Sequence, residues 1–176
     1  MSRILKLEGI FRGVAKGFYS GAKFFSGTPD TVAQVRLNRD DVLVALYQGY
    51  SFQEGDNDSY TAQNVGWFIG LRDNYSAKKP EYTINAIASA EILMEQFNEA
   101  LKALESTESI SFGDFNLAPQ FKNNQELVSG IWCQANIIFA GCETTNYPNL
   151  EHYIGEISRK ISPADWVPYN PESMKL

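Results

Sequence analysis

The longest periodic stretch of the chain runs from Glu81 to Glu105 and has the spacing of an amphipathic helix. Apolar residues recur every three to four positions and predict one buried stripe: Ile84, Ile87, Ala90, Met94, Phe97, Leu101 and Leu104. Polar residues occupy the rest of the helical wheel and predict a wet, largely acidic face: Asn85, Glu91, Glu95, Asn98, Glu99, Lys102 and Glu105. Pro80 and Glu81 suit a helix start, because the first turn needs no N–H from proline and favours a carboxylate. We expect the rest of the chain to pack on this helix.

Three stretches have the patterns of β-strands. Val42–Tyr47 is an unbroken apolar run, which is typical of a strand buried on both faces in the middle of a sheet. In Val65–Leu71 the glycines at 66 and 70 share one face and leave room for a neighbouring element to pack closely. Leu127–Ala140 alternates most clearly, with an apolar face that includes Cys133 and a mixed face. Helix and strands together predict an α+β fold.

The first 26 residues predict a second amphipathic helix, because apolar residues from Ile4 to Phe25 keep helical spacing. Glycines at 9, 13, 17 and 21 would line one edge and let another backbone approach closely, although each costs about 1 kcal/mol relative to alanine. The segment is basic through Arg3, Lys6, Arg12, Lys16 and Lys23. It is either a docking or membrane-surface helix or an ordinary first helix that covers a sheet.

Four segments are predicted to connect these elements. The apolar positions between Val32 and Leu37 indicate a short strand or an extended link, and Glu54–Ser59 is polar and turn-rich, as in an exposed loop. Arg72–Pro80 is a polar crossing into the central helix. Ser111–Pro119 is an extended connection that carries aromatic residues.

The last part of the chain predicts a short helix and an irregular tail. Leu150–Ile161 has a helical apolar stripe, while the tail from Ser162 contains three prolines and cannot form a regular helix. We expect a single domain, residues 1–176, in three parts: the N-terminal amphipathic helix (1–26), an α+β core (32–143), and a C-terminal helix with a proline-rich tail (144–176).

The bulk composition narrows the class of protein. A formal charge of −6 argues against general nucleic-acid binding, although the N-terminal segment is basic and the body acidic. No apolar run is long enough for a membrane span or a signal peptide, so we expect a protein made and folded in a cytoplasm. Cys133 and Cys142 fall on opposite parities around a strand end, which favours free thiols over a disulfide.

We find no sequence signature of catalysis or of a bound cofactor. A Cys–His nucleophile pair would have to use His152, the only histidine, and no activating motif surrounds either cysteine. A structural zinc site needs more clustered Cys and His. The glycines of the N-terminal segment follow no strand and lack the Gly-Lys-Ser/Thr of a phosphate-binding loop. The Asp56-Asn57-Asp58 run lacks the later glycine and glutamate of a calcium loop. We expect no enzyme activity, no catalytic residue, no metal and no cofactor.

The order of elements resembles the tail-terminator proteins of contractile-tailed phages, particularly the Mu-type family. The resemblance covers residues 35–143 and rests on pattern: a strand ending in Tyr-x-Gly (Val42–Gly49), the strand Val65–Arg72 with its Arg-bearing turn, the helix Ala86–Leu104, the Asn-Leu-Ala-Pro segment (Asn116–Pro119) and the closing strand Gly130–Gly141. The glycine-spaced first helix and the proline-rich tail depart from the usual pattern of that family.

The resemblance implies a mainly antiparallel sheet of about four strands flanked by helices, in a subunit that forms a homo-hexameric ring on the tail tube. Such a ring stops tube and sheath growth and offers a surface to the neck proteins, and the acidic body would suit a conduit for DNA. The expected location is the virion, with assembly in the host cytoplasm. Candidate contact residues lie in the basic first helix, the polar crossing and the tail: Arg3, Lys6, Arg12, Lys16, Lys78, Lys79, Trp166 and Tyr169.

Two other functions fit the same sequence. A monomeric phage or bacterial accessory protein could use the acidic helix face to mimic nucleic acid and inhibit a host enzyme that binds it. A peripheral membrane protein could be held by the basic N-terminal helix. Self-association separates the first alternative from a ring-forming terminator, and liposome flotation tests the second.

Overall fold

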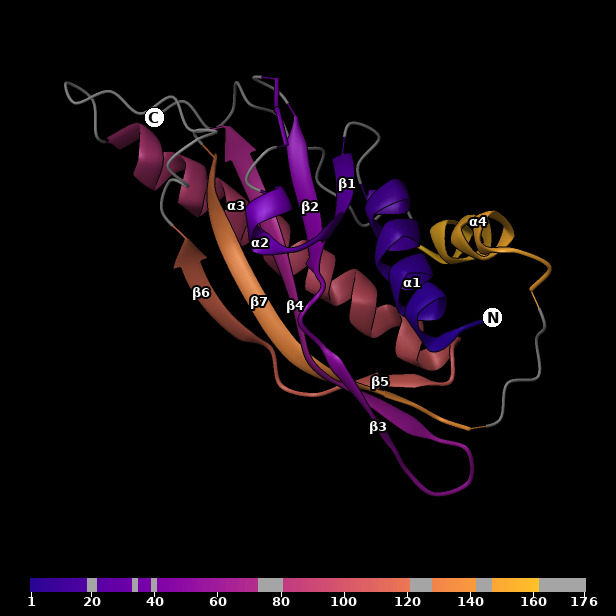
Figure 1. Cartoon of the computed structure of the whole chain (residues 1–176). Helices are drawn as coiled ribbons and strands as arrows, with labels where there is room; N and C mark the ends of the chain where they lie inside the picture. Colours follow the sequence, from indigo (N-terminus) through magenta and orange to yellow (C-terminus); the bar gives the residue numbers. More distant parts are fainter. Residues whose placement is uncertain are drawn as a thin grey trace.

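The structure, a computed structural model, describes residues 1–18, 22–32, 35–38, 41–72, 81–120, 128–141 and 147–161. It is an α+β fold built on a mixed sheet of seven strands (Figure 1). The strands are β1 (Ala22–Gly27), β2 (Val42–Tyr47), β3 (Ser51–Glu54), β4 (Tyr60–Arg72), β5 (Ile110–Phe112), β6 (Asn116–Gln120) and β7 (Val128–Phe139). The helices are α1 (Arg3–Phe18), α2 (Pro29–Val32), α3 (Glu81–Ala103) and α4 (Leu150–Lys160), with a 3-10 turn, η1, at Leu104–Ser106.

The sheet runs in the order β1-β2-β4-β7-β5, with β3 paired to β4 and β6 paired to β7. The β1–β2 pair is parallel and every other pair is antiparallel. The expected antiparallel sheet of about four strands is thus too small and lacks the parallel edge strand. The class is confirmed as α+β.

One face of the sheet and the helices enclose the main core. Odd-numbered residues of β7 and the alternating residues Val65, Trp67, Ile69 and Leu71 of β4 pack there, as their sequence parity predicted. Helices α1 and α3 pack on this face, and α4 packs on α1 (Figure 1). The opposite face carries a smaller cluster formed by Leu37, Leu43, Ala45, Tyr47, Phe68 and Val128.

The central helix lies where the periodicity predicted it. Ala90, Met94, Phe97, Leu101 and Leu104 of the apolar stripe are buried. The prediction was wrong at two positions. Ile84, which was placed in the buried stripe, is 64% exposed near the first turn, and Asn98, which was placed on the wet face, is only 6% exposed.

The N-terminal helix is shorter than predicted. It ends at Phe18, and residues 22–27 form β1 instead of continuing the helix to Phe25. Ala22 and Phe25 fit helical spacing. They lie instead, with Phe24, in a strand that pairs with β2, and Phe24 contacts the core. The gain of a full parallel ladder with β2 explains why the strand replaces the last turns of a glycine-weakened helix.

Two connections also differ from their prediction. Pro29–Val32 is a short helix, and the segment 35–38 has no regular structure. Of the two alternatives for Val32–Leu37, these described residues therefore form a link and no strand. Most of Ser111–Pro119 belongs to β5 and β6, which pair with successive parts of the same edge of β7. The loop Glu54–Ser59 is confirmed as an exposed hairpin turn after Glu54 ends β3.

The glycines of α1 form the close contact with α4 that their spacing predicted. A Cβ added to Gly9 would lie 2.5 Å from Tyr153 Cδ1, and one on Gly13 would lie 2.6 Å from Ile157 Cβ. At Gly17 a Cβ would lie 2.9 Å from the carbonyl oxygen of Ser158. The first helix therefore covers its own sheet and is itself covered by α4, as the second interpretation of this segment held.

Replacing Gly13 with alanine is expected to lower the free energy of unfolding by about 1–3 kcal/mol, because the added methyl overfills the α1–α4 contact. The matched control is Gly155→Ala in α4, where a Cβ meets nothing within 4 Å. Alanine there is expected to stabilise by about 1 kcal/mol through helix propensity alone. Urea unfolding of both variants measures the difference, and equal stabilisation by both would refute the close packing.

Candidate assembly surface

The side of the sheet opposite the main core carries an uncharged, amide-rich surface, which we call the amide face. It spans β3, the first part of β4, β5, β6 and residues 132–138 of β7, and Figure 1 views the sheet from this side. Its exposed or half-exposed residues are Ser51, Gln53, Thr61, Gln63, Asn64, Ser111, Asn116, Ala118, Gln120, Trp132, Gln134, Asn136 and Ile138. Each is uncharged, so this surface offers mainly amide and hydroxyl hydrogen-bonding groups. The exposed carboxylate of Asp114 lies at its border, in the turn between β5 and β6.

A β-bulge in β4 organises the middle of the amide face. The register between β4 and β7 shifts between Ala62 and Val65, and Asn64 adopts φ 56°. Asparagine tolerates this left-handed conformation better than most residues. The Asn64 N–H donates to Asn136 Oδ1 at 2.9 Å, and the Gly113 N–H donates to the Asn136 carbonyl oxygen at 2.9 Å. Asn136 thus connects the bulge of β4 to the turn between β5 and β6.

An aromatic pair borders the amide face. The ring centroids of Tyr47 and Trp132 lie 4.6 Å apart with their planes at 50°. Trp132 lies over Gly66, where a Cβ would come within 2.1 Å of the indole Cη2. The alternate glycines of β4 therefore admit a neighbouring side chain closely, as their spacing predicted. Half-buried Trp132 gives the otherwise polar face an apolar anchor.

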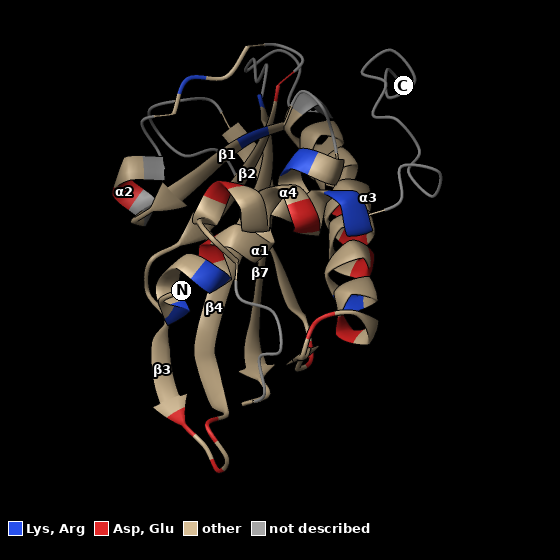
Figure 2. Cartoon of the chain, turned by 90° about the vertical axis from the view of Figure 1, so that its right-hand side faces the viewer, with Lys and Arg blue, Asp and Glu red and all other residues tan. Residues whose placement is uncertain are grey.

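Negative charge lies on other sides of the molecule. Glu91, Glu95 and Glu99 are exposed on the outer side of α3, and Asp56 and Asp58 are exposed at the tip of the β3–β4 hairpin. Figure 2 shows these acidic positions along α3 and at the projecting hairpin. In the described part of the chain these carboxylates thus lie away from the amide face, which Asp114 borders in the β5–β6 turn.

A buried polar chain crosses the main core and explains why Asn98 is not on the wet face. The indole N–H of Trp67 donates to Asn98 Oδ1 at 3.1 Å, and Asn98 Nδ2 donates to Cys133 Sγ at 3.6 Å. A buried indole N–H without an acceptor would cost about 1–3 kcal/mol. Asn98 therefore satisfies the core tryptophan, and Cys133 acts as a buried structural thiol.

Alkaline pH is expected to destabilise the fold. Burial raises the pKa of the Cys133 thiol from 9.0 to about 12, despite the opposing hydrogen bond from Asn98, and burial raises the pKa of Tyr47 from 10.0 to about 12. Because the folded chain holds both protons more tightly, their stabilising contributions are full below pH 9 and are lost as the pH rises toward 12. Urea unfolding across this range should show a falling free energy of unfolding. Tyr47→Phe should show a shallower fall, and an unchanged slope would contradict burial of the Tyr47 hydroxyl.

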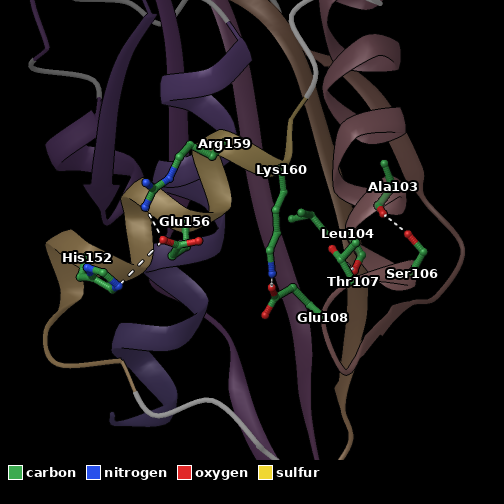
Figure 3. A network of polar contacts seen from close by, with 9 residues as sticks. All are labelled: Ala103, Leu104, Ser106, Thr107, Glu108, His152, Glu156, Arg159 and Lys160. Atoms are coloured by element: carbon green, nitrogen blue, oxygen red, sulfur yellow. Dashed lines mark hydrogen bonds and ion pairs between the residues drawn. The ribbon is translucent and has the colours of Figure 1, made fainter.

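A network of polar contacts joins α4 to the end of the central helix (Figure 3). Lys160 of α4 forms an ion pair with Glu108, and Glu156 accepts a hydrogen bond from Arg159. His152 Nε2 lies 3.9 Å from Glu156 Oε1. The only histidine thus belongs to the outer side of α4, whereas Cys133 is buried in the sheet, so the two do not form a nucleophile pair.

The described residues contain no group of three or more His, Cys, Asp or Glu able to hold a metal ion. An open depression of about 440 Å³ lies beside Ile138 and is lined by residues 105–111, 138 and 140. Its two carboxylates are engaged, because Glu105 accepts from the Phe112 N–H at 2.6 Å and Glu108 pairs with Lys160. Within the described ranges, no helix combines the length and apolarity that crossing a lipid bilayer requires.

The basic residues of the first helix are largely engaged within the fold. Arg3 lies 3.2 Å from Glu54 and stacks over Tyr60, and Arg12 lies 3.7 Å from Glu151. Lys6 is 7% exposed, with Nζ 5.2 Å from the Phe139 ring centroid, so it offers almost no contact surface. Lys16 is exposed. The other candidate contacts, Lys78, Lys79, Trp166 and Tyr169, lie outside the described residues, as does Cys142.

Sequence reasoning did not identify the amide face. The mixed parity of β7 was a signal for Gln134 and Asn136, but their neighbours on β6 were assigned to a connection without strand register. The surface becomes continuous only when Asn116 pairs with Gln134 and Gln53 with Thr61.

A scan against models of known protein families finds no match to this chain, and neither does a comparison of its sequence with curated proteins.

Proposed function

We propose that the protein is a structural subunit of a phage particle, a tail terminator that closes the tail tube as a homo-hexameric ring. One observation carries the proposal. The segments on which the resemblance rests, near Val42–Gly49, Val65–Arg72, Asn116–Pro119 and Gly130–Gly141, fall on β2, β4, β6 and β7. These strands are neighbours in one sheet, so the shared pattern corresponds to a contiguous structural unit.

The chemistry of the described residues supports a role carried by surfaces. Trp67, Asn98 and Cys133 of the core are joined by hydrogen bonds, Lys160 of α4 pairs with Glu108, and the open depression has its carboxylates engaged. The acidic exterior would repel DNA, which suits a ring through which a genome passes without sticking. The proposed partners are other copies of the chain, the tail tube, the sheath and the neck proteins, and the proposed location is the virion.

The mass in solution tests this proposal. Light scattering after size exclusion, across a concentration series, should give a species near six times 19.7 kDa. A strict monomer at every concentration, which also fails to bind purified tails lacking their terminator, would overturn the proposal.

The contact residues proposed in the first helix and the tail need different tests. Deleting α1 removes part of the main core, so loss of ring assembly in that variant would report unfolding. Truncation after Ile161 leaves the described elements intact. If the truncated chain still forms rings and attaches to tails, Trp166 and Tyr169 are not required contacts.

The acidic side of α3 favours a second candidate function. Glu91, Glu95 and Glu99 are all exposed and lie along about 12 Å of the helix, at the rise of 1.5 Å per residue. Such a row of carboxylates suits an accessory protein that occupies the nucleic-acid site of a host enzyme. A monomer that competes with DNA for a lysate nuclease or polymerase, and loses competition in Glu91→Gln/Glu95→Gln/Glu99→Gln, would support this function over the ring.

A further inference from the structure

We propose that the amide face is the surface on which a second copy of this chain docks. The inference rests on the proposed ring function and assigns one of its interfaces. A chain with a formal charge of −6 repels its own copies, and the repulsion is strongest where two acidic surfaces meet. The residues of the amide face are uncharged and Asp114 lies at its border, so an acidic neighbour meets less like-charge repulsion there than at the carboxylates of α3 or of the β3–β4 hairpin.

The composition of the face matches the centre of a protein interface. Interface centres are depleted in charged residues and enriched in aromatic ones, and polar groups there form hydrogen bonds across the contact. Trp132 is half-buried beside Tyr47, and Ile138 is 47% exposed at the opposite end of the face. These two apolar side chains would anchor a partner, while Asn116 and Gln134 lie between or beside them as donors and acceptors. Gln53 already accepts a hydrogen bond from Gln63 within the face.

Docking on the face is favoured over strand addition at the β6 edge of the sheet. Strand β6 is the outer neighbour of one end of β7, and it contains Pro119, which has no N–H to donate to an added strand. Such an edge opposes strand addition by another copy. The flat side of the same strands has no such block, since Asn116 and Ala118 are exposed on it.

The extent of the face is enough for a weak contact. Four strands at about 4.8 Å spacing and about eight residues at about 3.3 Å give a footprint of about 500 Å². Two such footprints total about 1,000 Å², at the low end for specific interfaces. We therefore expect single contacts to be weak and the complete ring to gain stability from closure, so assembly should be strongly concentration-dependent.

Charge insertion tests the proposal. Ala118→Glu/Gln134→Glu adds two negative charges to adjacent strands of the face, at positions whose side chains are exposed or half-exposed. The matched control is Ile84→Glu/Ile92→Glu, which adds the same charge to the exposed side of α3, where these residues are 64% and 49% exposed. Light scattering across a concentration series compares both with the parent chain, and thermal melts check that each variant folds.

The amide face is supported if the face variant dissociates at concentrations at least tenfold above those of the parent while the α3 control assembles normally. Assembly of the face variant like the parent would overturn this inference and leave the proposed ring function standing. Equal dissociation of both variants would also overturn it, because total charge would then be responsible. A parent that is monomeric throughout would overturn this inference, and it would overturn the ring function as well if the chain also fails to bind purified tails lacking their terminator. If the double variant fails to fold, Ala118→Glu alone carries the test, because residue 118 is exposed.

Discussion

Replacing Gly130 with alanine is expected to remove most of the stability of the fold. A Cβ at this position would lie 2.0 Å from the carbonyl oxygen of Ile69 and 2.7 Å from Gly70 Cα. Both atoms belong to the backbone of β4, so no side-chain rotation can relieve the overlap. Gly130 and Gly70 are directly paired in the β4–β7 ladder, which forms the centre of the sheet. We expect a loss of about 3–5 kcal/mol in the free energy of unfolding, which is a large fraction of the stability of a typical domain.

The control for this substitution is Gly49→Ala, because a Cβ at residue 49 meets nothing within 4 Å. Urea unfolding of this variant should differ from the parent by no more than about 0.5 kcal/mol. A Gly130→Ala variant that loses less than about 1 kcal/mol would show that β4 and β7 can separate locally without cost, contrary to the close pairing described above.

Replacing Phe97 with alanine is expected to have an effect of similar size, about 3–5 kcal/mol, because it opens a cavity in the main core. Phe97 is fully buried, with its ring centroid 6.2 Å from that of Phe11 and 5.6 Å from that of Phe18. It therefore joins the central helix to the first helix through two aromatic contacts. Circular dichroism during thermal and urea unfolding measures the loss.

Ile92→Ala in the same helix is the control for Phe97, since Ile92 is 49% exposed. Both variants place alanine in α3, so helix propensity favours both and cannot explain a difference. We expect Ile92→Ala to change the free energy of unfolding by less than about 1 kcal/mol. Similar losses in the two variants would mean that α3 does not bury the side that the fold assigns to the core.

The spacing of apolar residues predicted the elements that have at least one continuous buried face. The faces of β4 and β7, the buried strand β2, the central helix and the stripe of α4 all follow directly from local spacing. Strands β5 and β6 lack such a signal, because every described position of β6 is exposed or half-exposed. An edge strand of this kind is defined by its hydrogen bonds to β7, which join residues that are distant in sequence.

Asn98 and the amide face escaped prediction for a related reason. On a helical wheel Asn98 has the polarity of the solvent side, and only the position of Trp67 on another element explains its burial. The amide residues are individually ordinary surface residues. They form one continuous uncharged surface only through the register of five strands.

Because α1 packs against α4, its main helix–helix contact can form only late in synthesis of the chain. α1 is complete at Phe18, but the helix that covers its glycines begins only at Leu150, about 130 residues later. At 5–20 residues per second, synthesis of that interval takes on the order of ten seconds. An isolated helix of this length with three glycines is marginal in water, so the first helix emerges long before its covering contact exists. The contact between α1 and α4 therefore forms only after the sheet and the central helix have been synthesised.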